Sequence, residues 1–112
     1  MAENPDTGSG SKLAALNSST LGVKMPEITL PDGSKVQTGT VGALLVNIRT
    51  YNEAHRTGDN DKMAQLAESM RATLPLLDKV GLFDLFGPEE WIRGDNEGRK
   101  AVGKMYQEFK RQ

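Results

Sequence analysis

Residues 40–80 have the sequence TVGALLVNIRTYNEAHRTGDNDKMAQLAESMRATLPLLDKV, and this stretch decides the expected fold. Its first part carries apolar or aromatic side chains every three or four residues, which predicts a helix from Thr40 to about Arg56. The stripe on this helix consists of Val41, Leu44, Leu45, Ile48, Tyr51 and His55. Val46 lies off the main stripe, so the apolar surface is wider than one neighbouring helix covers.

The second part of the stretch predicts another helix, from about Asn60 to Val80. Its stripe consists of Met63, Leu66, Ala67, Met70, Leu74, Leu77 and Val80. Pro75 interrupts the pattern, and because proline removes a backbone hydrogen bond, we expect the helix to kink or restart there, with Thr73 as a cap. The connector at Gly58 is short, which predicts an antiparallel αα-hairpin with Asp59 or Asp61 capping the second helix.

Elements on either side complete the expected fold. Residues 27–37 alternate apolar and polar around Pro31-Asp32-Gly33, which predicts a β-hairpin. Residues 87–90 favour the start of a short helix, since proline and two acids suit a first turn. A last helix should open at Asp95 or Asn96 and run to about Lys110, with Val102, Met105, Tyr106 and Phe109 as its apolar face.

The expected class is therefore mainly α: an αα-hairpin plus a C-terminal helix, with a small N-terminal β-hairpin (α+β by a strict count). Residues 1–25 are rich in Gly, Ser, Thr, Asn and Ala and bury too little to offset their ordering entropy, which predicts a flexible tail. Residues 26–112 are expected to form a single small helical domain. The alternative for the tail is an arm that orders on a partner, anchored by Leu13 and Leu16.

Composition narrows the function classes. The 112 residues include 14 basic and 15 acidic side chains, a formal net charge of −1, so no global field attracts nucleic acid or an anionic membrane. There is no cysteine, which excludes a disulfide scaffold, a cysteine-ligated zinc and a cysteine nucleophile. No apolar run is long enough to span a membrane, so we expect a soluble, cytoplasmic protein.

Two short motifs look like ligand loops and fail on context. Residues 98–104 match G-x-x-x-x-G-K, but the flanks are helical and Met105 stands where a phosphate loop needs Ser or Thr. Asp59-Asn60-Asp61 resembles the start of a calcium loop, but Ala64 and Met70 replace its glycine and its last carboxylate. We therefore predict no phosphate site, no metal and no cofactor.

The single histidine, His55, stands one helical turn after Tyr51. A catalytic histidine needs an orienting carboxylate and a nucleophile, and the sequence supplies neither at helical spacing. The favoured interpretation is a hydrogen-bonded histidine at the helix end, where its interaction with the helix dipole is favourable. Four carboxylates lie near Trp91 in the sequence: Asp84, Glu89, Glu90 and Asp95. Paired acids beside an aromatic ring would suit a sugar site, but nothing in the sequence places two of them on opposite sides of a cleft. No catalytic residue is assigned.

Residues 82–92 concentrate aromatic side chains, with Phe83, Phe86 and Trp91 close together. One interpretation is that they fill a small core. The other is an exposed patch that binds a partner or a second copy, because Trp and Phe are favoured at interfaces. We favour the core, because small cores need their aromatics.

Three functional hypotheses remain. The first is a non-enzymatic protein-interaction domain that self-associates as a homodimer. The second is a small-molecule-binding protein or minor enzyme, with a pocket near Tyr51, His55 and Trp91. The third is a toxin–antitoxin or phage accessory partner whose tail orders on binding. An enzyme is not the favoured interpretation.

Residues 30–45, LPDGSKVQTGTVGALL, together with residues 86–91, FGPEEW, carry a resemblance. They are similar to segments of short uncharacterised bacterial proteins. The resemblance covers residues 27–110 and implies no activity, since such families have none assigned.

Overall fold

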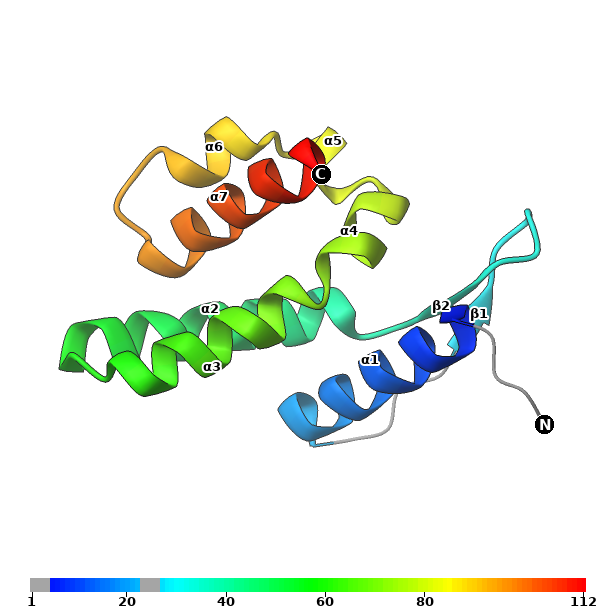
Figure 1. Cartoon of the computed structure of the whole chain (residues 1–112), viewed down its shortest axis with the longest axis horizontal. Coiled ribbons are helices and arrows are strands. Elements are labelled where there is room, and N and C mark those ends of the chain that lie inside the picture. Colours follow the sequence, from blue (N-terminus) through cyan, green and yellow to red (C-terminus); the bar gives the residue numbers. More distant parts are fainter. Residues whose placement is uncertain (1–4, 23–26) are drawn as a thin grey trace. The chain divides into compact units, whose positions relative to one another are not determined.

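The computed structural model describes residues 5–22 and 27–112, and it divides into two compact units, Met1–Ala43 and Leu44–Gln112 (Figure 1). Most of the described chain is helical, as the sequence predicted, and one two-stranded sheet accompanies the helices. The domain boundary predicted near residue 25 lies outside the described residues and stays a prediction.

The predicted β-hairpin is confirmed in the first unit. Strand β1 (Glu27–Thr29) pairs antiparallel with β2 (Lys35–Gln37), and Ile28 lies opposite Val36. Asp32 shapes the turn, since its Oδ1 accepts a hydrogen bond from the backbone N–H of Ser34 at 2.9 Å. Short polar residues form such turns because their side chains bond the backbone two residues on.

The first unit also contains helix α1 (Pro5–Leu21), where the sequence predicted no regular structure. Leu13 and Asn17 are buried on this helix. The Asn17 Nδ2 donates to Thr40 Oγ1 at 2.9 Å and to the Thr38 carbonyl at 3.3 Å. These hydrogen bonds fix one side of α1 to a segment more than twenty residues further on, a contact that composition does not reveal.

The predicted mobility of residues 1–25 stays a prediction. Glycine and serine lower the intrinsic helix stability of this segment. We expect limited proteolysis, followed by mass spectrometry, to remove residues up to about Met25 and to leave a resistant fragment. If α1 resists the protease as well as the helices of the second unit do, the prediction of a flexible tail is wrong.

The αα-hairpin is confirmed. Helix α2 (Thr40–Thr57) and helix α3 (Asn60–Arg71) run in opposite directions from a tight connection (Figure 1). Gly58 has a φ of 76°, a left-handed conformation that suits glycine at a helix end. Asp59 caps α3 as predicted, since its side chain accepts from the backbone N–H of Lys62 at 3.1 Å.

The break at Pro75 is also confirmed. Helix α3 ends at Arg71, and α4 (Leu74–Val80) restarts with Pro75 in its first turn. The capping role predicted for Thr73 is wrong, although its position is right. Its hydroxyl donates instead to the Met70 carbonyl at 2.6 Å, and so bonds the end of the preceding helix.

Three further helices complete the second unit: α5 (Leu82–Leu85), α6 (Pro88–Ile92) and α7 (Glu97–Arg111). The short helix expected at residues 87–90 is α6. The Glu90 carboxylate accepts from the backbone N–H of Gly87 at 2.9 Å, which holds its first turn. Asn96 caps α7 through a 2.9 Å bond from the N–H of Arg99.

The core of the second unit draws side chains from all six helices, α2 to α7. It consists of Leu44, Ile48, Met70, Leu74, Leu77, Phe83, Trp91, Val102, Met105 and Tyr106. Phe83 stacks on Tyr106 with ring centroids 3.8 Å apart, and lies 5.4 Å from the Trp91 ring. Aromatic side chains bury large areas, so this trio gives a small unit much of its apolar burial.

Two glycines of α7 allow its neighbours to approach closely. A Cβ built at Gly98 would lie 2.9 Å from the Ile48 carbonyl oxygen of α2. At Gly103 it would lie 2.8 Å from Trp91 Cβ and 3.1 Å from the Pro88 carbonyl oxygen of α6. The 2.9 Å and 2.8 Å distances are shorter than real Cβ contacts, so a side chain at either position would push two helices apart.

The Tyr106 hydroxyl donates to Asp78 Oδ1 at 2.6 Å. We expect the ionisation of this hydroxyl to contribute to the pH dependence of the free energy of unfolding. Burial, with the Asp78 hydrogen bond and charge, raises the pKa of Tyr106 to about 12. Because the folded pKa lies above the ordinary value of about 10, this contribution is full below pH 10 and is lost as pH rises toward 12.

We expect urea midpoints to fall over this pH window, and Tyr106→Phe to remove that part of the fall. The variant should also be less stable at neutral pH, by about 1 kcal/mol, because Asp78 loses a donor. The same pH dependence in Tyr106→Phe as in the wild type would contradict the assignment.

Candidate functional site

The side of α2 that faces away from the core carries an unusual amount of apolar surface. Leu44 and Ile48 on the inner side are buried, whereas Leu45 is 55% exposed and Val46 is 39% exposed. A surface helix normally keeps such residues in its buried stripe. Two adjacent apolar side chains on the outer side therefore need a further explanation.

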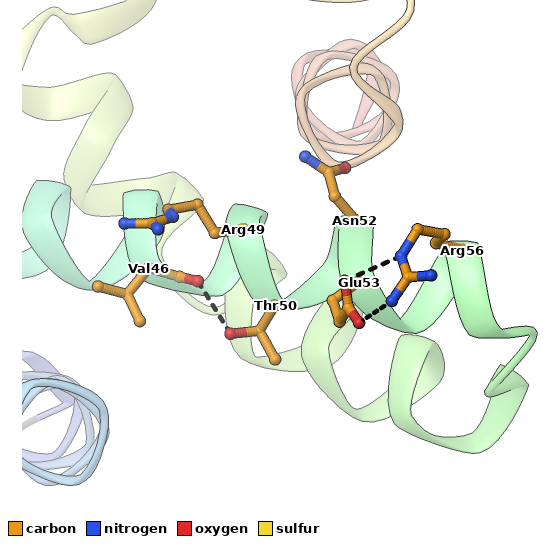
Figure 2. Close-up of a pocket in the computed structure, with 6 residues that line it drawn as sticks. All are labelled: Val46, Arg49, Thr50, Asn52, Glu53 and Arg56. Atoms are coloured by element: carbon orange, nitrogen blue, oxygen red, sulfur yellow. Dashed lines mark hydrogen bonds and ion pairs between the residues drawn. The ribbon is translucent and has the colours of Figure 1, made fainter.

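A hollow of about 670 Å³ lies beside Val46 and is lined by side chains of α2, which Figure 2 draws as sticks. Its lining consists of Val46, Arg49, Thr50, Asn52, Glu53 and Arg56. The Thr50 hydroxyl donates to the Val46 carbonyl at 3.1 Å, within the helix, and so turns its methyl group outward to the surface. The hollow is apolar at the Val46 end and charged toward the end of α2.

The charged end is largely internally paired. The Arg56 Nε donates to Glu53 Oε2 at 3.1 Å, and a second guanidinium nitrogen contacts the other carboxylate oxygen (Figure 2). This pair lowers the pKa of Glu53 and raises the pKa of Arg56, in each case chiefly through the hydrogen bond. Arg49 forms no ion pair within residues 5–22 and 27–112, so it is available to a ligand or partner.

Asn52 fixes this side of α2 relative to α7. Its Oδ1 accepts from the backbone N–H of Gly98 at 2.6 Å, and its Nδ2 donates to Asn96 Oδ1 at 3.0 Å. The first N–H groups of a helix have no partner within the helix, so Asn52 supplies one from α2. The Asn52 side chain therefore holds α2 in place beside α7.

The residues that the sequence nominated fall in two environments. Phe83 and Trp91 are buried, and Tyr51 packs against the same core. The Trp91 indole donates to the Phe86 carbonyl at 2.9 Å, and Arg99 lies 5.5 Å above its ring. Phe86 itself is exposed. The 82–92 segment is therefore divided between core and surface, where the sequence had offered these as alternatives.

His55 lies on the surface near the end of α2, and not within the apolar stripe where the sequence placed it. Its Nε2 is 3.9 Å from Glu97 Oε2, and Lys100 contacts the other Glu97 oxygen at 2.8 Å. The hydrogen bond from Lys100 is the main reason that the pKa of Glu97 is lowered. His55 is not among the residues that line the hollow, nor are Tyr51 and Trp91.

The G-x-x-x-x-G-K motif has a structural explanation. Residues 98–104 lie wholly inside α7, with no preceding strand. Its two glycines are the close-approach positions against α2 and α6. The spacing that resembles a phosphate loop therefore comes from packing one helix against two neighbours.

These features define a small, mainly α domain whose candidate site is an exposed helix side with an apolar and a charged end. The chain belongs to a family described as Domain of unknown function (DUF7709), whose model matches residues 11–110. This confirms the resemblance to uncharacterised proteins and extends the matched range into α1. No curated protein and no solved structure matches the chain.

Within residues 5–22 and 27–112, no helix combines the length and apolar content that crossing a membrane requires.

Proposed function

We propose that this chain is a non-enzymatic protein-interaction domain that forms a homodimer through the outer side of α2. The observation that supports this is the exposure of Leu45 and Val46 on a helix whose inner side is already in the core. Exposed apolar side chains that adjoin one another are typical of interaction sites. Covering them would return this helix side to the pattern expected of a stable fold.

A second copy is the occupant that the geometry favours. Two-fold dimers bring the same patch of each copy together, so Leu45 and Val46 would meet their own counterparts. The hollow beside Val46 offers room for side chains of the opposite copy. Its charged end would form a polar rim, and the unpaired Arg49 would be free to contact a carboxylate there.

The alternative is a small-molecule site near Tyr51, His55 and Trp91. Tyr51 and Trp91 pack with the core, while His55 is exposed beside Glu97. This separation favours the interaction domain over a pocket lined by the three.

Val46→Glu tests the proposal. It sets a charge at the centre of the proposed contact, and like charges facing each other across a two-fold axis oppose association. We expect the dimer dissociation constant to rise by at least about tenfold, equivalent to about 1.4 kcal/mol, in sedimentation equilibrium.

Val80→Glu is the matched control, since Val80 is a valine of similar exposure on α4. It should leave association unchanged. Equal association of Val46→Glu and wild type would contradict the use of this helix side.

The proposed compartment is the cytoplasm, because a chain without cysteine has no need of an oxidising environment.

A further inference from the structure

A second set of exposed apolar side chains, which we call the corner patch, lies where α4 meets α5, and none of them lines the hollow on α2. This corner patch consists of Val80, Leu85 and Phe86, which are 49%, 72% and 44% exposed. The backbone N–H of Leu85 donates to the Gly81 carbonyl at 3.2 Å, which ties the end of α5 to the end of α4. The three residues therefore bracket one tight turn.

The exposure of Phe86 is imposed by a well-anchored backbone. Its N–H donates to the Leu82 carbonyl at 3.0 Å, and its carbonyl accepts from the buried Trp91 indole at 2.9 Å. The next N–H, of Gly87, is held by the Glu90 carboxylate. A surface held in this way loses little conformational entropy on binding, which favours affinity.

Acidic side chains outnumber basic ones in the chain segment that carries the corner patch. Between Val80 and Ile92 the ionisable side chains are Asp84, Glu89 and Glu90, all acidic and exposed. Glu90 bonds Gly87, and a Cβ at Gly87 would lie 3.2 Å from Glu89 Oε2, so both carboxylates lie beside Gly87, the residue that follows Phe86. Lys79 is the basic residue that borders the patch.

We propose that the corner patch is a docking surface for a segment of another protein that presents apolar residues flanked by Lys or Arg. Apolar contact at Leu85 and Phe86 would supply affinity, and the acidic surroundings would select a basic partner. A second copy docking by the same patch would bring like charges together. The patch is therefore distinct from the self-association surface on α2.

The full chain can be tested with two synthetic amphipathic peptides of about four helical turns. One combines Leu with Lys, and the other replaces every Lys with Glu. Trp91, the only tryptophan, bonds the Phe86 carbonyl and so reports on the patch. We expect saturable binding of the Leu–Lys peptide, seen as a Trp91 emission shift, that weakens with added salt. The Leu–Glu peptide should bind at least about tenfold more weakly.

Two variants locate the binding. Leu85→Ser combined with Phe86→Ser should weaken the Leu–Lys peptide by about tenfold or more, and both side chains are exposed enough for the fold to survive. Asp84→Asn combined with Glu89→Gln should weaken it without removing apolar contact. Val46→Glu, which targets the self-association surface, should bind the peptide as the wild type does.

Several results would overturn the proposal. These are equal binding of the two peptides, unchanged binding by the Leu85 and Phe86 double variant, or loss of binding in Val46→Glu. Dissociation of the homodimer by the double variant would also overturn it, because the patch would then be a contact between copies. The peptide-binding results can be read whether or not α2 mediates self-association.

Discussion

Replacing Gly103 with Ala should destabilise the second unit by about 1–3 kcal/mol, the usual cost of adding a methyl group to a tightly packed position. The new Cβ would stand 2.8 Å from Trp91 Cβ and 3.1 Å from the Pro88 carbonyl oxygen. Neither atom belongs to the flexible end of a side chain, so α6 and α7 would have to separate. At an open helical position the same change stabilises by about 1 kcal/mol, so the expected sign is reversed.

Gly42→Ala is the matched control. Gly42 is also helical, and its Cβ would meet only Leu21 Cδ2 at an ordinary 3.9 Å. We expect it to be neutral or stabilising by up to about 1 kcal/mol. Urea unfolding at one fixed protein concentration, followed by Trp91 fluorescence, measures both variants. A Gly103→Ala protein as stable as Gly42→Ala would contradict the close approach of α6 and α7.

Leu77→Ala should cost about 2–5 kcal/mol, because it leaves a cavity in the core. Leu77 is fully buried on α4, among the side chains that the other helices contribute. A small domain has a total stability of about 5–15 kcal/mol, so this single change should shift the urea midpoint far or leave the unit unfolded at room temperature.

Leu85→Ala is the control for Leu77→Ala, since it makes the same chemical change at a largely exposed position. It should alter the free energy of unfolding by no more than about 0.5 kcal/mol. Similar losses of unfolding free energy from both variants would contradict the burial of Leu77 in the core.

Local signals were sufficient for most of the second unit. The apolar periodicity of residues 40–80 predicted the αα-hairpin, and Pro75 predicted the restart of the helix, because both effects depend on a few neighbouring residues. The same kind of local signal predicted Asp59 or Asp61 as the cap of α3, and the structure shows Asp59 in that role. The capping role predicted for Thr73 is wrong because a hydroxyl at such a position can bond either the helix before it or the helix after it.

Long-range contacts could not be predicted in this way. The G-x-x-x-x-G-K spacing did draw attention to Gly98 and Gly103, but only the partners on α2 and α6 explain why glycine is needed there. Asn52 and Asn17 each bond residues far along the chain. Composition gave α1 no support as a helix, because the partners of Asn17 and Leu13 come from a later segment.

The candidate site was anticipated in part. Val46 stood out as lying off the main stripe, and it now lines the hollow on α2. Tyr51, His55 and Trp91 drew attention as residue types that are common in sites. Trp91 is instead held by the core, and burial of a large aromatic depends on all the helices that surround it.

Sedimentation velocity of the full chain, over a concentration series through the micromolar range, tests the central claim most directly. We expect a species of twice the chain mass whose share increases as the concentration rises, because a two-fold contact through Leu45 and Val46 is reversible. A single species of monomer mass, unchanged at every concentration, would contradict it.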